Sequence, residues 1–215
     1  MEKKVSASVI NRLPRYYRYL TDLEANGIDR ISSKELSKRM GITASQIRQD
    51  LNCFGGFGQQ GYGYNVKHLY NEIAGILGIP SQYKAILVGA GNMGQALIQN
   101  ITFEKRGFSL VGVFDNDPQK IGSQIKGFTI LDFSEGKAFI EKHHPTMAII
   151  STPKGAANQV ASELIKLGIK AFLNFTSAEI TLGCDVVVEN IHLSDGLMRL
   201  CYKISAQKEI KQQGE

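Results

Sequence analysis

The sequence lacks any apolar run long enough to cross a membrane. No stretch approaches the 18 apolar residues that a spanning helix needs. Residues 1–4 are Met-Glu-Lys-Lys, and polar and basic residues follow, so the apolar core of a signal peptide is also missing. These absences exclude a membrane protein and predict a cytoplasmic location.

Cysteine and histidine are scarce. Cys53, Cys184 and Cys201 are scattered and not in C-x-x-C spacing, which is typical of buried thiols. Nothing nearby indicates the lowered pKa that an oxidation-sensing thiol needs. The four histidines include no H-x-x-x-H pair, and we predict no metal site.

The chain has little excess charge, but the excess is unevenly placed. The net charge is +5 over 215 residues. Residues 1–80 hold 11 Lys and Arg against 7 Asp and Glu, whereas the remainder holds 14 against 13. A polyanionic partner is therefore expected to bind the N-terminal third of the chain.

A glycine-rich turn follows the apolar residues 85–88, which are typical of a strand buried on both faces. The turn fits G-x-G-x-x-G, and a helical pattern begins at residue 95. Gly89 would permit the tight turn, Gly91 the approach of a pyrophosphate, and Gly94 close helix–strand packing. With 22 glycines the pattern alone is weak, and the flanking strand and helix strengthen it. The candidate cofactor contacts here are Gly89, Ala90, Gly91, Asn92, Met93 and Gly94.

A second apolar run, residues 110–114, ends at Asp115, 26 residues beyond Gly89. This offset favours a carboxylate that accepts ribose hydroxyls. The alternative is that Asp115 only begins the turn continued by Asn116 and Asp117. Because no Arg is adjacent and Lys120 is five positions away, the pattern favours NAD(H) over NADP(H).

The N-terminal segment predicts a helix-turn-helix. Residues 8–26 have apolar side chains at helical spacing, and Pro14 is either tolerated early in this helix or marks its start. Two capping boxes follow, Ser32 with Glu35 and Thr43 with Gln46, and Gly41 supplies the turn between their helices. The alternative is a pair of solvated surface helices.

In such a unit the start of the second helix faces the major groove. Arg48 would suit guanine there and Gln49 adenine. The candidate DNA contacts in the two helices are Lys34, Ser45, Gln46, Arg48 and Gln49.

Residues 54–64 hold five glycines and four aromatics, which predicts a hairpin that would be the wing of a winged helix. A flexible linker, the alternative, rarely contains so many aromatics. The candidate DNA contacts in the wing are Phe57, Gly58, Gln59, Gln60, Gly61 and Tyr62. Asn65 should cap a helix over residues 66–77, and Gly78 with Pro80 ends a DNA-binding domain of residues 1–79.

Strands and helices alternate beyond residue 80. Strands are expected at residues 128–131, 147–151, 171–175 and 186–188, and helices at 133–142 and 156–167. This order predicts an α/β fold, a Rossmann-like, mainly parallel sheet over residues 80–191. Ligands bind beyond the carboxyl ends of such strands, although loop chemistry alone could explain polar residues there. The candidate cofactor contacts at these ends are Thr152, Pro153, Asn174 and Phe175.

From Leu193 the pattern is helical, and no further strand is expected after this helix. This helix packs either on its own domain or on a partner chain. Residues 192–215 are therefore treated as a separate C-terminal segment.

Taken together, these segments resemble the Rex family of redox-sensing transcriptional repressors over nearly the whole chain. The resemblance lies in Gln-Ile-Arg-Gln-Asp-Leu at 46–51, the glycine–aromatic wing, the glycine turn, Phe-Asp-Asn-Asp-Pro at 114–118, and residues 168–175. It implies a homodimer in which the last helix is swapped onto the partner. It also implies a regulator, not an enzyme, that leaves double-stranded palindromic operator DNA when NADH rises relative to NAD⁺.

Two departures from the family pattern concern the ligand site and the contact between domains. Members often have Asn-Phe-Ala-Pro where this chain has Asn-Phe-Thr-Ser at 174–177. They also have an Asp at the start of the swapped helix, paired with an arginine that corresponds to Arg18. Here that position is His192, and Asp195 one turn along is a possible substitute.

Two other classes remain open. One is an NAD-dependent oxidoreductase with an appended DNA-binding domain, although no Tyr is followed four residues later by Lys. The other is a regulator that senses CoA or another nucleotide.

Overall fold

The computed structural model of the chain describes residues 5–55, 58–59, 62–100, 102–181, 183 and 185–213. They form two compact units, Met1–Ser81 and Gln82–Glu215. The division lies two residues beyond the expected one, because the turn η1 (Ile79–Ser81) stays with the helix before it. Residues 192–215, expected as a separate segment, are grouped with the second unit.

The first unit begins with two helices where one was expected. α1 (Ala7–Ile10) and α2 (Leu13–Ala25) replace the single helix predicted over residues 8–26. Pro14 lies in the first turn of α2, where its missing N–H costs nothing. Of the two roles expected for Pro14, the second is confirmed, because the proline lies at the start of α2.

The helix-turn-helix consists of α3 (Ser33–Met40) and α4 (Ala44–Asn52), and the left-handed Gly41 ends α3. Ser32 and Glu35 form the predicted reciprocal capping box. The second box is only half formed. Thr43 accepts from the Gln46 N–H, but the Gln46 side chain is turned toward the buried Asp50, to which its Nε2 donates.

A three-stranded antiparallel sheet forms the predicted wing. Its order is β1-β3-β2, and β1, which the sequence analysis missed, pairs with β3. The strands are β1 (Arg30–Ile31), β2 (Gly58–Gln59) and β3 (Gly63–Asn65). Asn65 caps α5 (Val66–Ile76) as expected. Phe57, Gln60 and Gly61 lie outside the described residues.

The second unit is built on a sheet of order β10-β9-β8-β4-β5-β7-β6, parallel except for the short edge strand β6. The sequence analysis did not predict β6, because a strand of two residues is too short to show the alternation of apolar and polar side chains. The strands are β4 (Tyr83–Val88), β5 (Phe108–Asp115), β6 (Gln124–Ile125), β7 (Phe128–Asp132), β8 (Met147–Ile150), β9 (Ala171–Asn174) and β10 (Val187–Asn190).

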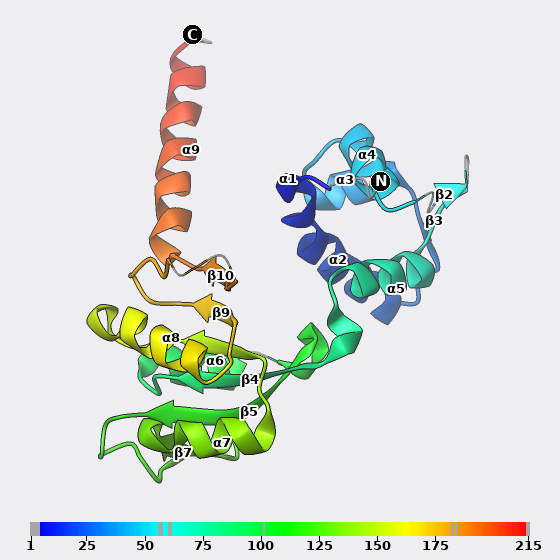
Figure 1. Cartoon of the computed structure of the whole chain (residues 1–215). Coiled ribbons are helices and arrows are strands. Elements are labelled where there is room, and N and C mark those ends of the chain that lie inside the picture. Colours follow the sequence, from blue (N-terminus) through cyan, green and yellow to red (C-terminus); the bar gives the residue numbers. More distant parts are fainter. Residues whose placement is uncertain are drawn as a thin grey trace. The chain divides into compact units, whose positions relative to one another are not determined.

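Helices cover both faces of this sheet (Figure 1). Leu97 of α6 joins the core on the Leu87 side of β4, whereas α7 and α8 pack on the side of Ile86 and Val88. Successive β4 side chains point to opposite faces, so the strand is apolar throughout. The helices and turns are α6 (Asn92–Asn100), η2 (Glu104–Arg106), η3 (Phe133–Glu135), α7 (Gly136–His143), η4 (Lys154–Ala156) and α8 (Ala157–Lys166).

The chain order reverses at β4, which positions the ligand site. From β4 the chain crosses to β5 on one side, and it later returns to β8 on the other. The carboxyl ends of β4 and β8 are therefore adjacent, with Ser151 N donating to Val88 O at 2.9 Å. Such a switch point opens a crevice where sheets of this kind bind ligands.

The last helix, α9 (Leu193–Gln213), follows β10. Its apolar side chains are solvent-exposed within the single chain: Leu193, Leu197, Met198, Leu200, Tyr202 and Ile204. In the described part of the chain, no helix is long and apolar enough to span a membrane.

Candidate functional site

The glycine turn between β4 and α6 has the geometry that its sequence predicts. Gly89 has φ +100°, and a Cβ there would lie 2.7 Å from Ser151 O. A Cβ on Gly94 would lie 2.0 Å from Gly89 O, so the helix can approach the strand only at glycine. At Gly91, by contrast, a Cβ would meet none of the described heavy atoms within 4 Å outside its chain neighbours. The backbone is therefore open to a ligand at Gly91 alone of the three.

Two of the other turn residues pack into the protein interior. The Ala90 side chain is buried, and Met93 packs against the core on the Leu87 side of the sheet. Asn92 is exposed and is the first residue of α6. The first N–H groups of a helix have no intrahelical acceptor, so this end of α6 favours an anion.

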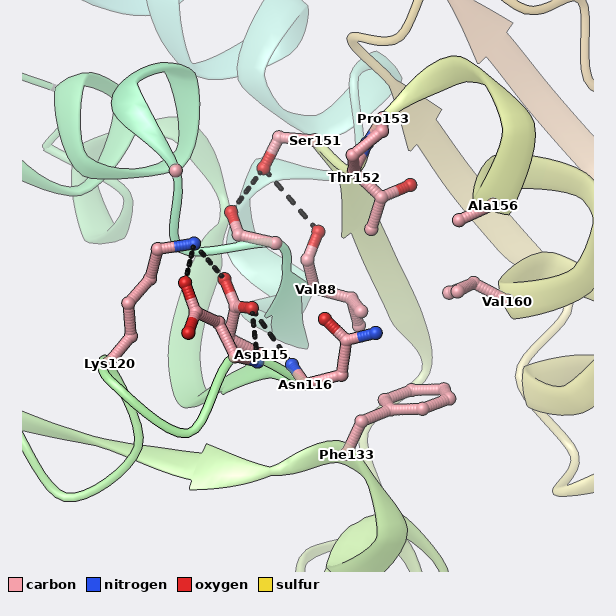
Figure 2. Close-up of a pocket in the computed structure, with 13 residues that line it drawn as sticks. Val88, Asp115, Asn116, Lys120, Phe133, Ser151, Thr152, Pro153, Ala156 and Val160 are labelled. Carbon is pink, nitrogen blue, oxygen red and sulfur yellow. Dashed lines mark hydrogen bonds and ion pairs between the residues drawn. The ribbon is translucent and has the colours of Figure 1, made fainter.

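A cavity of about 410 Å³ lies beside Gly91, within the usual range for cofactor pockets (Figure 2). It runs from a charged end at Asp115 to an apolar wall that includes Phe133 and Val160. Its lining residues are Val88, Gly89, Gly91, Asp115, Asn116, Asp117, Lys120, Phe133, Ser151, Thr152, Pro153, Ala156 and Val160.

Asp115, at the end of β5, anchors the glycine turn. One of its oxygens accepts from Ala90 N at 2.7 Å, and the other from Asn116 N at 2.8 Å and Asp117 N at 3.0 Å. Burial raises the pKa of this carboxyl, but the N–H groups of Asp117 and Ala90 and the Lys120 ammonium lower it more. The pKa therefore lies below its usual value. The carboxylate is ionised at neutral pH and holds the turn to β5.

Lys120 lies close to this carboxylate, although it is five positions away in sequence. Its Nζ is 3.3 Å from Asp115 and 3.2 Å from Asp117. The hydrogen bond to Asp117, followed by that to Asp115, raises the pKa of Lys120. The sequence indicated Lys120 as the nearest cation, five positions away, and the turn after β5 folds this lysine back against the carboxylate (Figure 2).

Thr152 lines the cavity and has an unsatisfied polar side-chain atom. Its Oγ1 is buried and has no hydrogen-bond partner among the described residues. A buried hydroxyl without a partner is costly, and a ligand group at the site would satisfy it. With Gly91 open beside it, the residues present fit a nucleotide.

The remaining predicted cofactor contacts divide between the cavity and the protein interior. Pro153 lines the cavity, whereas Asn174 and Phe175 are not among its lining residues. The fully buried Asn174 amide donates to Ala178 O at 2.6 Å and to Asn190 Oδ1 at 2.7 Å, so it organises the loop after β9. The sequence analysis did not identify Phe133 as a cavity residue. It follows β7, far along the chain from the glycine turn, and nothing in the local sequence indicates that the two meet.

Four of the five helical DNA candidates are exposed: Lys34, Ser45, Arg48 and Gln49. Gln46 is half-buried, and its Nε2 donates to Asp50 Oδ1 at 2.9 Å. In the wing, Gly58 and Gln59 form β2. Tyr62 is 70% exposed, with the Arg30 guanidinium 5.8 Å from its ring centre.

The residues expected to form the contact between the units are Arg18 in the first and His192 or Asp195 in the second. Arg18 is exposed on α2 in the first unit. In the second unit, His192 Nε2 lies 3.7 Å from Glu179 Oε1, and Asp195 is in the first turn of α9. The pairing of Arg18 with either residue stays a prediction.

Cysteines and metal ligands add no second site within the described residues. Cys53 is half-buried and Cys201 exposed, so the expectation of buried thiols was wrong for both, and Cys184 lies outside the described residues. No group of three or more His, Cys, Asp or Glu that could hold a metal ion occurs in the described part of the chain.

A family model described as a DNA-binding protein N-terminus matches residues 4–52, and one described as a CoA binding domain matches residues 80–178. Together with the winged helix and the Rossmann-like cavity, these two matches define the class of protein: a DNA-binding regulator with a nucleotide-binding domain.

The redox-sensing transcriptional repressor Rex of Caldanaerobacter subterraneus subsp. tengcongensis is 50% identical over 213 residues, 98% of this chain and 95% of the relative. The Rex of Caldicellulosiruptor saccharolyticus is 50% identical over 212 residues, 99% and 97% of the two chains. The chain belongs to the Rex family of redox-sensing transcriptional repressors.

Solved structures of one relative agree with this. A Rex-family repressor called RSP, in complex with β-NAD⁺ and operator DNA, matches with a TM-score of 0.87 and 47% identity over 99% of both chains. Its complex with β-NADH matches with a TM-score of 0.87 and 44% identity over 98% of this chain and 99% of that one.

Proposed function

We propose that this chain is an NADH/NAD⁺-responsive repressor that binds palindromic operator DNA as a homodimer and is released when NADH binds. The observation that carries this proposal is the glycine turn, which is open at Gly91 beside a cavity lined by Thr152, whose hydroxyl has no hydrogen-bond partner among the described residues. The solved complexes of RSP with β-NAD⁺ and operator DNA and with β-NADH support it. The cofactor is sensed here and not consumed.

The cavity suits the adenosine half of the dinucleotide. The pyrophosphate would lie over Gly91 at the start of α6, where the free N–H groups point. The adenine would pack against the apolar wall near Phe133 and Val160. The nicotinamide would then extend beyond Gly91.

The ribose hydroxyls would meet Asp115 at the charged end. The Asp115 carboxylate already accepts hydrogen bonds from four donors, one for each of its four lone-pair sites. A ribose hydroxyl must therefore replace one of these donors. The Lys120 ammonium is the longest of these contacts at 3.3 Å and can move to Asp117. Two carboxylates against one ammonium still leave a net negative charge, which disfavours the 2′-phosphate of NADP(H).

Discrimination between the redox forms needs no chemical step. The oxidised nicotinamide ring is positively charged and the reduced ring is not, so an apolar environment penalises NAD⁺ by desolvation. Moving a two-state protein from mostly DNA-competent to mostly incompetent takes about 5.5 kcal/mol of differential affinity, which two sites in a dimer can share.

The exposed apolar residues of α9 support the homodimer. Leu193, Leu197 and Met198 are 67%, 66% and 62% exposed in the single chain. Such a face on one helix favours burial against another protein surface. A second copy with the helix swapped would bury it.

The central experiment measures release from DNA. A duplex selected from a random library by the full-length protein is labelled, and NADH, NAD⁺, NADPH and CoA are added in turn while anisotropy is followed. NADH should release the duplex at the lowest concentration, from a complex whose light-scattering mass is that of a dimer.

Two other outcomes would contradict this proposal. Release by CoA alone would favour the CoA-sensing alternative, which the matched CoA-binding family model supports. Oxidation of NADH during the titration, with an added carbonyl compound, would favour the oxidoreductase.

Thr152→Val tests whether the ligand uses the unpartnered hydroxyl. Valine has nearly the same shape, so the ligand-free protein should be equally or more stable, by up to about 1–3 kcal/mol, because an unsatisfied buried group is removed. NADH affinity should fall about tenfold, because a hydrogen bond to the ligand is lost. Calorimetric titration and urea unfolding measure the two effects, and unchanged NADH affinity would remove Thr152 from the site.

A further inference from the structure

Arg48, the candidate guanine reader on α4, is held by a residue of the neighbouring helix. Its Nη1 donates to Ser33 Oγ at 3.0 Å, across 15 positions of sequence. An exposed arginine normally samples many rotamers, and a residue that reads a base must give up that freedom on binding. The bond to Ser33 restricts the side chain before DNA arrives.

The position of Ser33 is itself fixed by the local structure. Ser33 is the first residue of α3, directly after the capping box in which Ser32 Oγ accepts from Glu35 N at 3.1 Å. Because Ser32 supplies the cap, the Ser33 hydroxyl is available to accept from Arg48. The buried Leu36 and Ile47 lie in one core and pack α3 with α4, so the two ends of the bond belong to one rigid body.

The bond to Ser33 leaves most of the Arg48 guanidinium available for DNA. The guanidinium uses one of its five N–H donors on Ser33, which leaves enough for a bidentate contact to guanine O6 and N7.

We propose that Ser33 is a positioning residue that pre-orients Arg48 for base recognition and thereby contributes to sequence specificity. This inference rests on the proposed DNA-binding function. It predicts that Ser33 acts only through Arg48 and only on specific DNA. Non-specific binding depends on phosphate contacts, which a fixed guanidinium plane does not improve.

The test compares Ser33→Ala, Ser33→Thr, Arg48→Ala and the double variant Ser33→Ala/Arg48→Ala in the full-length protein. Binding is measured by anisotropy to the duplex selected by the wild type and to an unrelated duplex of equal length. Ser33→Ala should bind the selected duplex about three- to tenfold more weakly, the loss expected when a long side chain must be ordered on binding. Ser33→Thr, which keeps the hydroxyl, should bind the selected duplex as tightly as the wild type. Equal thermal unfolding midpoints would show that every variant is folded.

Each outcome has a distinct meaning. In the Arg48→Ala background, Ser33→Ala should have no further effect on the selected duplex. If Arg48→Ala weakens binding but Ser33→Ala does not, the positioning role is wrong and base reading stands. If Arg48→Ala itself binds both duplexes like the wild type, the assigned base reader is wrong. Tighter binding by Ser33→Ala would overturn the inference, because the bond would then compete with DNA.

Discussion

Gly94→Ala is expected to abolish NADH binding and to destabilise the second unit by about 3 kcal/mol or more. The added Cβ would lie 2.0 Å from Gly89 O and 3.0 Å from Ser151 Oγ, so α6 must move away from β4. That movement displaces the helix N-terminus from the place where the pyrophosphate would bind. Calorimetric titration with NADH and urea unfolding measure the two losses.

Gly91→Ala and Gly75→Ala are the matched controls. A methyl group on Gly91 has open space on the protein side, so stability should be unchanged while NADH affinity falls. Gly75→Ala, in α5 and also in open space, should be neutral or slightly stabilising, because alanine favours the helix by about 0.5–1 kcal/mol. Normal NADH affinity in Gly94→Ala would show that the close helix–strand contact is not needed.

Asp50→Ala is expected to cost about 3–5 kcal/mol of stability in the first unit, the range for breaking a buried ion pair. The carboxylate is fully buried and accepts from Arg12 Nε and Nη2, both at 2.7 Å, from Tyr16 OH at 2.9 Å and from Gln46. These bonds connect α2 with α4. Hydrogen exchange of the α4 amides measures the loss, and Glu24→Ala, an exposed change on α2, should stay within about 0.5 kcal/mol.

The same carboxylate predicts a pH dependence. Burial raises the pKa of Asp50, but hydrogen bonds from Arg12, Gln46 and Tyr16 lower it more, so the folded value lies below the unfolded one. Its contribution to stability is therefore complete above about pH 4 and is lost as the pH falls toward the folded pKa. Asp50→Asn should lack this acid-dependent loss, and an identical pH profile for variant and wild type would contradict the assignment.

Local signals in the sequence predicted the elements of the site well. Gly89 and Gly94 could be assigned to a tight turn and a close helix contact, because only glycine tolerates those positions and strand and helix patterns flank them. The pair Ser32 and Glu35 predicted the start of one helix, and Asn65 predicted the start of another. Both signals are local, because a capping side chain bonds to a residue only three positions away. The apolar period over residues 8–26 did not show where α1 ends and α2 begins, whereas Pro14 did indicate a possible helix start.

The sequence by itself determined that a winged helix precedes a parallel nucleotide-binding sheet, because periodicity, caps and glycine conformations are local properties of the chain. Only the tertiary structure decided how the polar groups are paired. It placed Lys120 against Asp115, turned Gln46 toward Asp50, enclosed Asn174 in the loop after β9, and left Thr152 Oγ1 without a partner among the residues that the structure describes. Such pairings depend on which distant strand ends and helix faces meet during packing, and most of them leave no period or spacing that can be read along the chain.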